Sequence, residues 1–379
     1  MYLEFIEANN FRNLTGKINW GRRLNIIHGK NGQGKTNWLE AVYVLSRSKS
    51  FRTQRLQETI RFGEDLAVIK GRVLSGIDIS RDLRVTVQGN TKWIAVNDKH
   101  EPIQRYLGQL QLFAFTADEL EVVRGVPEAR RRFLDRGITS LRPAYVRTLA
   151  SYNKVLKQKN RILQQAADRS ARLEEVENLL FPWNEQLVSL AAQIYSARMD
   201  YVALLVTQLE HSLFEPFELR IRYRSALEGK GALDDYQSLL SERLRLRLAA
   251  EVAAGHSLLG VHRDELELLF KGREMRVFGS SGQQRSALLL LDLAAISLYN
   301  LEHRDYPIFL IDDVDAELDE SRITQLLDYL DGRTQTFITT SKRNQVENFL
   351  SRAGVYEIED GSVLAREASD KYVMAAQGD

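Results

Sequence analysis

The chain has 379 residues, enough for about two domains, and its 44% hydrophobic and 27% charged residues are ordinary for a globular protein. Its 52 lysines and arginines nearly balance its 51 aspartates and glutamates, so any surface for a polyanion must come from local clustering of charge. The sequence contains no cysteine, which excludes disulfides, thiolate zinc sites and cysteine nucleophiles and fits a reducing compartment.

The first seven residues alternate like a β-strand and lack the basic and apolar segments of a secretion signal. The longest apolar stretch, residues 287–299, is interrupted by Asp292 and is too short to span a bilayer. We interpret that stretch as a buried helix and expect a cytoplasmic protein with no membrane association.

Residues 29–36 form a complete phosphate-binding loop, preceded by an apolar strand at residues 24–28 and followed by helical spacing. The glycines of such a loop let the backbone N–H groups face phosphate oxygens, Lys35 neutralises the β- and γ-phosphates, and the Thr36 hydroxyl reaches Mg²⁺. Because strand, loop and helix occur in the required order, the sequence predicts a nucleoside triphosphate site and not a glycine turn without a ligand.

Short strand patterns lie on both sides of a long helical block. Those before the block predict an antiparallel β meander beside the nucleotide core, and those after it predict the rest of that core. The predicted strands span residues 66–73, 83–87, 93–96, 308–311, 336–339 and 355–358.

The helical block has no glycine between Gly137 and Gly229 and is filled with helix-forming residues at helical spacing. Pro143, Pro182 and Pro216 are its expected break points, which gives three or four helices. Two of these helices are long enough to pack as an antiparallel arm. The block serves either as a support for the core or as a dedicated binding surface.

We therefore predict an α/β fold: a P-loop ATPase head with a mixed sheet, helices and an antiparallel β meander, and an inserted α-helical arm domain. The predicted domains are a discontinuous ATPase domain at residues 1–117 and 256–379 and an inserted helical arm at residues 118–255. The polar tail after about Arg366 is expected to be mobile.

The apolar run at residues 308–311 ends in Asp312 and Asp313. A buried strand of this kind delivers a carboxylate to its carboxyl end, where Asp312 would hold Mg²⁺ beside Thr36. Asp313 is then the candidate that orients or deprotonates the attacking water. An acid pair at a strand end is weakly specific alone, and the phosphate loop strengthens its interpretation.

Ser280 and Gly282 begin the apolar helix, where free N–H groups, a hydroxyl and the positive end of the helix dipole converge on one spot. This is either an ordinary helix cap or an anion site. Since the loop around Lys35 already surrounds one side of the phosphates, we expect Ser280 and Gly282 to contact a nucleotide that is bound by another subunit.

Together these segments resemble the ABC-type ATPases: residues 29–36 as Walker A, 280–283 as the signature, 308–313 as Walker B and 316–319 as the D-loop. Within that superfamily the chain resembles the RecF family of bacterial recombination and repair proteins. The resemblance runs in order from the first residues to about residue 319. The motifs that carry it are residues 9–13, 31–37, 39–41, 50–52, 115–135 and 260–264.

The resemblance implies which side chains contact ATP and Mg²⁺. Lys35, Asp312 and Asp313 would be catalytic, and Thr36 and Asp312 would hold the metal. The implied ATP contacts are Gly29, Asn31, Gly32, Gly34, Lys35, Thr36, Asn37, Arg12, Arg52, Ser280, Gly282, Gln283 and Asp319.

The resemblance also implies an ATP-dependent, DNA-binding protein that dimerises head to tail, with two ATP molecules sandwiched between Walker A of one subunit and the signature of the other. ATP would switch DNA affinity, because the dimer doubles the contacts, and weak, DNA-stimulated hydrolysis would release the clamp. The implied role is repair of gaps after replication, in which RecR and RecO act with this family to load RecA on single-stranded DNA beside a duplex junction.

Three positions depart from the family pattern. Residues 339–341 stand where many ABC ATPases carry a switch histidine, and Val261 stands where proline is expected. Asp313 replaces the usual glutamate and is one methylene shorter, which predicts slow hydrolysis.

DNA phosphates require clustered lysine and arginine, although such runs are more often solvated helix faces. Nothing indicates readout of base edges, so we expect binding that depends on shape or on junctions. Arg52 is either an arginine finger or part of a surface salt bridge, and His262 is more typical of a structural histidine than of a catalytic one. The candidate DNA contacts are Arg130, Arg131, Lys154, Lys157 and Lys159, with Arg132, Arg136, Arg161, Arg243, Arg245 and Arg247 as further members of the same clusters.

Two other functions remain open. A transporter ATPase subunit normally has its signature much closer to Walker A than Ser280 is to Lys35 in this chain. A scaffold gated by ATP but unable to hydrolyse it is compatible with every motif. A long coiled-coil SMC protein is excluded by the length of the chain and the missing hinge.

Overall fold

The computed structural model describes residues 1–76, 79–169, 171–209, 213 and 219–367, and these fall into two compact units. The first unit contains Met1–Leu120 and the chain from Gly279 onward, and the second contains Glu121–Glu210 and Glu218–Phe278. The predicted division at residue 256 differs from this one, since residues 256–278 lie in the second unit. Pro216 and the tail from residue 368 lie outside the described residues.

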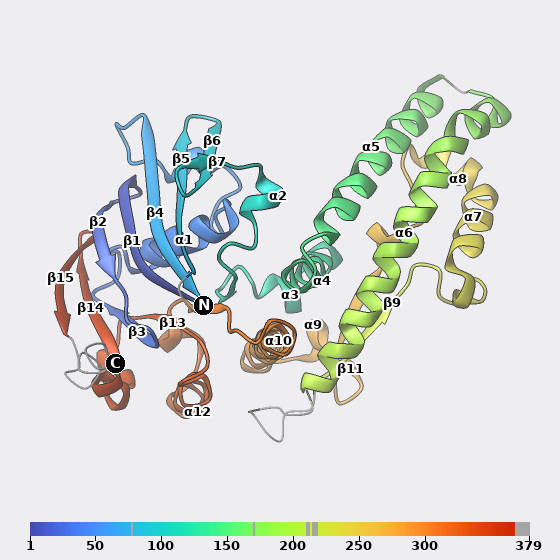
Figure 1. The fold of residues 1–379 in the computed structure, drawn as a ribbon. Helices are drawn as coiled ribbons and strands as arrows, with labels where there is room; N and C mark the ends of the chain where they lie inside the picture. The colour runs from blue at the N-terminus through green and yellow to red at the C-terminus, as the bar shows by residue number, and fades with distance from the viewer. Residues whose placement is uncertain (77–78, 170, 210–212, 214–218, 368–379) are drawn as a thin grey trace. The chain divides into compact units, whose positions relative to one another are not determined.

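An antiparallel sheet, here called sheet A, occupies the amino-terminal part of the first unit (Figure 1). Its long strands alternate buried and exposed positions, as expected for a sheet with one face on the core. This is the predicted meander, extended by the first two strands of the chain. In spatial order its strands are β2 (Leu14–Asn19), β1 (Tyr2–Phe11), β4 (Leu66–Ser75), β5 (Ile79–Gln88), β6 (Thr91–Val96) and β7 (Lys99–His100).

A mostly parallel sheet, sheet B, carries the phosphate loop. Every residue of β12 (Ile308–Ile311) and β13 (Thr336–Thr340) is buried, which is the pattern of parallel strands covered on both faces. Strand β15 (Ser362–Glu367) runs antiparallel to its neighbour. In spatial order the strands are β15 (Ser362–Glu367), β14 (Ala353–Glu359), β3 (Leu24–His28), β13 (Thr336–Thr340), β12 (Ile308–Ile311) and β8 (Leu112–Phe115).

Helix α1 (Lys35–Arg47) contacts strands of both sheets and shares one apolar core with them. Helix α10 (Ser281–His303) is buried along most of its length, as predicted from its apolar run. The remaining helices of this unit are α2 (Ile103–Tyr106), α11 (Val314–Glu317), α12 (Glu320–Leu330) and the 3₁₀ segments η1 (Leu56–Thr59) and η4 (Arg343–Arg352). The α/β fold class predicted from the sequence is confirmed.

The second unit is built around two long helices, α5 (Tyr145–Arg169) and α6 (Leu173–Leu209), which Figure 1 shows side by side and antiparallel. Its small sheet has the order β11 (Arg273–Glu274), β10 (Glu265–Phe270), β9 (Leu219–Arg224). The other elements are α3 (Glu121–Arg124), α4 (Pro127–Leu141), η2 (Leu233–Asp235), α7 (Tyr236–Leu246), α8 (Leu248–Ala254), η3 (Val261–Arg263) and α9 (Met275–Phe278).

The predicted break at Pro143 is confirmed, because α4 ends and α5 begins on either side of it. The break at Pro182 is wrong: this proline is exposed inside the continuous helix α6. A proline in a helix removes a backbone hydrogen bond and costs about 3 kcal/mol. The buried residues Leu180 and Leu187 hold the helix to its neighbours on both sides of Pro182, and their packing outweighs this local cost.

Several buried polar groups in the second unit are paired with one another. Arg198 forms a fork to the Asp135 carboxylate with two N···O distances of 2.9 Å. His262 Nδ1 lies 2.7 Å from the Tyr152 hydroxyl and Nε2 lies 3.4 Å from the Ser257 carbonyl, so a neutral ring with its proton on Nε2 satisfies both partners. Burial lowers the pKa of His262 to about 4. These contacts support a structural role for His262.

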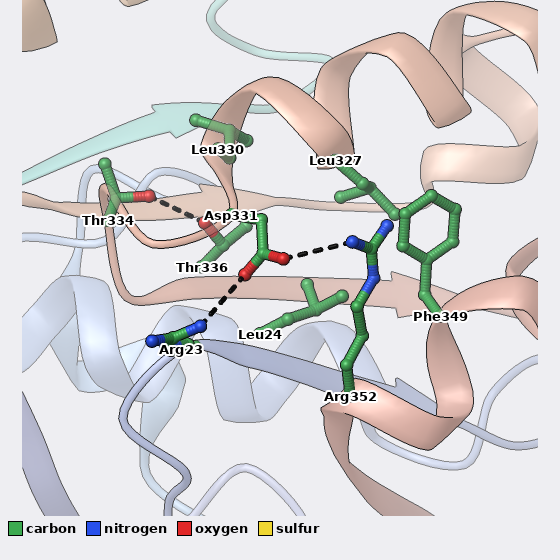
Figure 2. A pocket seen from close by; sticks show the side chains of 9 residues that line it. All are labelled: Arg23, Leu24, Leu327, Leu330, Asp331, Thr334, Thr336, Phe349 and Arg352. Carbon is green, nitrogen blue, oxygen red and sulfur yellow. Dashed lines mark hydrogen bonds and ion pairs between the residues drawn. The ribbon is translucent and has the colours of Figure 1, made fainter.

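A small hollow lies at the amino ends of β3 and β13, the opposite edge of sheet B from the phosphate loop. Figure 2 shows Asp331 between Arg23, at 3.8 Å, and Arg352, at 3.0 Å. The Thr334 and Thr336 hydroxyls share a hydrogen bond of 2.7 Å beside them. The charged side chains around this hollow thus neutralise one another.

Within the described ranges, no helix combines the length and apolarity needed to cross a bilayer.

Two adjacent leucines of α6, Leu179 and Leu180, test the packing between α5 and α6. Leu180 is fully buried with Leu163 and Leu248, whereas the adjacent Leu179 is 61% exposed. We expect Leu180→Ala to lower the free energy of unfolding by about 2–5 kcal/mol and Leu179→Ala to lower it by less than about 0.5 kcal/mol. Urea denaturation followed by circular dichroism checks this, and equal losses for the two variants would contradict the packing described.

The buried imidazole predicts a pH dependence. The pKa of His262 is about 4 in the fold and near its ordinary 6.5 when unfolded. The neutral ring therefore contributes stability that is present above pH 6.5 and is lost as the pH falls towards 4. We expect His262→Gln to flatten the pH dependence of the unfolding free energy across this window by about 3 kcal/mol. The exposed His256, changed to Gln, is the control, and an unchanged slope for His262→Gln would contradict the assignment.

Candidate nucleotide-binding site

The loop between β3 and α1 has the backbone that a phosphate cradle needs. Gly29, Gly32 and Gly34 have φ angles of 150°, 82° and 101°, in the left-handed region where side chains are strained. A Cβ at Gly29 would lie 2.5 Å from the Ile358 carbonyl oxygen, and one at Gly34 would lie 2.9 Å from the Asn13 side chain. The loop therefore requires glycine for conformation and for close packing.

Lys35 folds back over this loop. Its Nζ donates to the carbonyl oxygens of Gly29 at 2.8 Å and Lys30 at 3.0 Å, and the side chain is largely buried. Burial lowers the pKa of Lys35, while the nearby Asp313 and Asp312 carboxylates oppose that shift. The ammonium group therefore lies among the loop carbonyls, close to the acids that follow β12.

Asp312 joins the loop to the end of β12. Thr36 Oγ1 donates to Asp312 Oδ1 at 2.9 Å, and Thr339 Oγ1 donates to the same oxygen at 2.6 Å. Burial raises the pKa of Asp312, and the two hydroxyls, Arg52 and Lys35 oppose the shift. The predicted metal ligands Thr36 and Asp312 are thus brought together, and a hydroxyl beside a carboxylate fits Mg²⁺, which takes one or two protein oxygens and completes its shell with phosphates and water.

Asp313 follows in a strained position. Its φ angle is 52°, and its amide donates to Thr339 Oγ1 at 2.7 Å. Burial raises the pKa of Asp313, and the neighbouring Asp315 and Asp312 charges raise it further. Asp315 receives hydrogen bonds from the Ser341 amide at 3.1 Å and hydroxyl at 2.8 Å. A carboxylate with a raised pKa beside the metal position is suited to accept a proton from water.

Thr339 is the first of the three residues that stand where many ABC ATPases carry a switch histidine. The single hydroxyl of Thr339 contacts both the Asp312 carboxylate and the Asp313 amide. Sequence reasoning missed Thr339 as a site residue, because a threonine ending a buried strand looks like an ordinary sheet residue.

The predicted ATP contacts Arg12 and Arg52 lie on the side of α1. Arg12 forms a fork to the buried Glu40 carboxylate, with distances of 2.8 and 3.0 Å. Arg52 donates to the Asn37 side chain at 2.7 Å and lies 3.5 Å from Glu40. Asn37 in turn donates to the Asn13 side chain at 2.7 Å. Both arginines are therefore fixed beside the first turns of α1.

The predicted signature forms the amino end of α10. Ser280 is exposed and caps the helix: the Gln283 amide donates to Ser280 Oγ at 3.3 Å, and the Ser280 amide donates to Gln283 Oε1 at 2.9 Å. The Gly282 carbonyl accepts from Arg322 on α12 at 3.5 Å. Asp319 caps α12 through the Arg322 amide at 2.9 Å. The contacts of Ser280, Gly282 and Asp319 are thus with α10 and α12 and not with the phosphate loop, and Asn31 lies exposed on that loop.

Some of the predicted DNA contacts are buried and others are exposed. Arg130 and Lys159 are almost fully buried, in ion pairs with Glu265 at 2.6 Å and Glu251 at 2.8 Å. Arg131 is partly buried and donates to the Asp264 carbonyl at 2.9 Å. These contacts argue against Arg130, Arg131 and Lys159 as DNA ligands. Lys154 and Lys157 are exposed on α5.

Comparisons with known proteins show which proteins the chain is similar to. Residues 2–363 match the family described as the RecF/RecN/SMC N terminal domain. The chain is 35% identical over 374 residues to the DNA replication and repair protein RecF of Geobacillus sp. (strain WCH70), covering 96% of this chain and 99% of that protein. It is also 35% identical over 377 residues to the protein of the same name from Bacillus subtilis (strain 168), covering 96% and 100%.

Among solved structures, the recombination mediator protein RecF with ATP, described as part of the RecFOR pathway, has a TM-score of 0.86 and 30% identity and covers 97% of this chain and 98% of its own. An SMC head bound to the C-winged helix domain of ScpA has a TM-score of 0.61 at 14% identity, which shows a shared fold alone.

Proposed function

Because this chain belongs to the RecF family of DNA replication and repair proteins, we propose that it is an ATP-dependent DNA-binding protein that dimerises head to tail around two molecules of ATP. Each composite site would contain the phosphate loop of one subunit and the Ser280 end of α10 of the other. The observation that carries this proposal is that one unit contains two features suited to bind anions, the phosphate loop and the amino end of α10, and that the contacts described above do not join them. The α10 terminus is exposed and carries the positive end of a long helix, and its hydrogen bonds described above lie within α10 and with α12.

The proposed roles at each site follow from the geometry. The loop glycines and Lys35 hold the β- and γ-phosphates, and Thr36 with Asp312 holds Mg²⁺, which stabilises the charge that develops on the transferred phosphate. Ser280, Gly282 and Gln283 approach the γ-phosphate from the partner, and Asp319 lies beside them in the interface.

Asp313 is proposed as the base that accepts a proton from the attacking water. Its raised pKa, caused by burial and by Asp315 and Asp312, makes it a stronger base than an ordinary aspartate. Its short side chain reaches the water less well than a glutamate would, so we propose slow, DNA-stimulated hydrolysis that releases the dimer and its DNA.

The proposed DNA surface is the exposed side of α5. Arg147, Lys154 and Arg161 recur at intervals of seven residues, about 10.5 Å apart along the helix, with Lys157 beside them. All four side chains are exposed, and the sequence from residue 145 to 167 contains no aspartate or glutamate to neutralise them. A row of cations without base-reading groups favours binding to the phosphates of single- or double-stranded DNA at gap junctions, without sequence preference.

The biological role that we propose is repair of gaps left by replication, in the cytoplasm. The chain would act with RecR and RecO and indirectly help RecA to load on single-stranded DNA. This rests on the family and on the relative described as a mediator in the RecFOR pathway. An ATP-gated scaffold without hydrolysis is the alternative, and single-turnover hydrolysis with and without DNA separates the two.

Mixed variants test the composite site. We expect Lys35→Met and Ser280→Arg each to prevent the ATP-dependent dimer, because both sites of each homodimer lose one half. An equimolar mixture should recover a weak heterodimer, since one of its two sites combines an intact loop with an intact signature. Multi-angle light scattering with ATP checks this. Dimerisation of either variant alone, or none in the mixture, would contradict the shared site.

Charge removal tests the DNA surface. We expect the double variant Lys154→Gln, Lys157→Gln to weaken ATP-dependent DNA binding and to reduce the slope of log affinity against log salt by up to about 2, since each phosphate contact contributes about 0.9. Fluorescence anisotropy with gapped DNA at several salt concentrations measures both quantities. Arg105→Gln together with Lys271→Gln removes the same charge from exposed positions elsewhere and should leave the slope unchanged.

A further inference from the structure

Glu40 is a fully buried carboxylate at which two arginines converge. It lies on α1, one turn after Thr36 and on the same face of the helix. Arg12 reaches it from the end of β1, with Nη2 2.8 Å from Oε1 and Nε 3.0 Å from Oε2. Arg52 reaches it from the loop after α1, with Nη1 3.5 Å from Oε2.

The backbone around each arginine is fixed as well. The Ser50 hydroxyl donates to Glu40 Oε1 at 2.6 Å and accepts the amides of Arg52 at 2.8 Å and Thr53 at 3.1 Å, which shapes the turn that presents Arg52. Arg12 has a φ angle of 52° and donates its amide to the Thr59 carbonyl at 2.6 Å. One carboxylate therefore anchors two loops that are far apart in the sequence.

The charges in this cluster do not cancel. Two guanidinium groups face the Glu40 carboxylate, so Glu40 alone cannot neutralise both of them beside the first turns of α1. Arg52 also donates to Asn37, the residue next to Thr36.

We propose that Glu40 is a positioning residue for nucleotide binding. Its carboxylate holds Arg12 and Arg52 in place before ATP arrives, so their positive charge meets the phosphates without an entropic loss for ordering two long side chains. This inference rests on the proposed function of Arg12 and Arg52 as ATP contacts. The competing explanation is that Glu40 only braces α1 against the end of β1.

A double-mutant cycle separates positioning from bracing. Glu40→Gln keeps the shape of the side chain but removes its charge, and we expect it to weaken ATP binding roughly 10- to 100-fold, as loss of supporting partners commonly does. In an Arg52→Gln background the same change should weaken binding by a clearly smaller factor, because one of the two groups that it positions is already gone. Titration with a fluorescent ATP analogue measures all four proteins.

Two matched variants guard against a folding defect. Glu58→Gln removes a neighbouring carboxylate whose side chain contacts Thr53 and neither arginine, and it should leave ATP affinity within about twofold of wild type. Ser50→Ala removes one donor to Glu40 and should weaken ATP binding by a few fold while the thermal midpoint without nucleotide changes little.

Equal losses for Glu40→Gln in the wild-type and Arg52→Gln backgrounds would overturn the proposal, as would a lower thermal midpoint with unchanged ATP affinity. Unchanged ATP affinity in both Arg12→Gln and Arg52→Gln would overturn it too, because Glu40 would then have nothing to position. Lys35→Met reports on the nucleotide site independently: wild-type ATP affinity in that variant would refute the proposed function itself.

Discussion

The hydrogen bonds from Thr36 and Thr339 to Asp312 are the interactions on which the site depends. They join the carboxyl ends of three neighbouring strands of sheet B, because Thr36 follows β3, Asp312 follows β12 and Thr339 lies near the end of β13. In a parallel sheet these ends necessarily lie together, and the connections that follow them are free to carry polar groups. Because Asp312 is buried, its charge is tolerated through these donors and through the cations nearby. This junction fixes the positions of Lys35, Asp313 and the expected metal site.

Much of this arrangement could be predicted from local patterns. The phosphate loop needs a backbone conformation that glycine adopts readily, and it has a strand before it and a helix after it. The positive φ angles of Gly32 and Gly34 confirm that these positions need glycine. The strand at residues 308–311 was predicted to its ends, since four apolar residues between Pro307 and two aspartates favour a buried strand of that length. The apolar helix after Ser280 and the helical block were predicted for similar reasons. The α/β fold with an inserted helical block follows from these parts.

What the sequence could not predict depends on contacts between distant residues. Glu40 is a single acid in an amphipathic helix, and nothing local indicates that Arg12 and Arg52 converge on it. Arg130 and Lys159 belong to basic runs, yet their partners Glu265 and Glu251 come from far along the chain and draw them into the interior. Pro182 was expected to end a helix because the local cost of proline is large, and burial on both sides of it outweighed that cost. Charge counting along the sequence therefore overestimated how much of the basic runs is exposed.

The strand order of sheet B has a consequence for synthesis of the protein. Strand β3 delivers the phosphate loop, but both of its neighbours, β13 and β14, come from the last part of the chain. During translation β3 therefore emerges from the ribosome long before any partner strand exists, and helices α5 and α6, which follow each other in the sequence and pack together, can form in the interval. The phosphate loop then gains its neighbouring strands only after these helices, and a nascent chain cannot complete the nucleotide pocket before β13 and β14 have emerged.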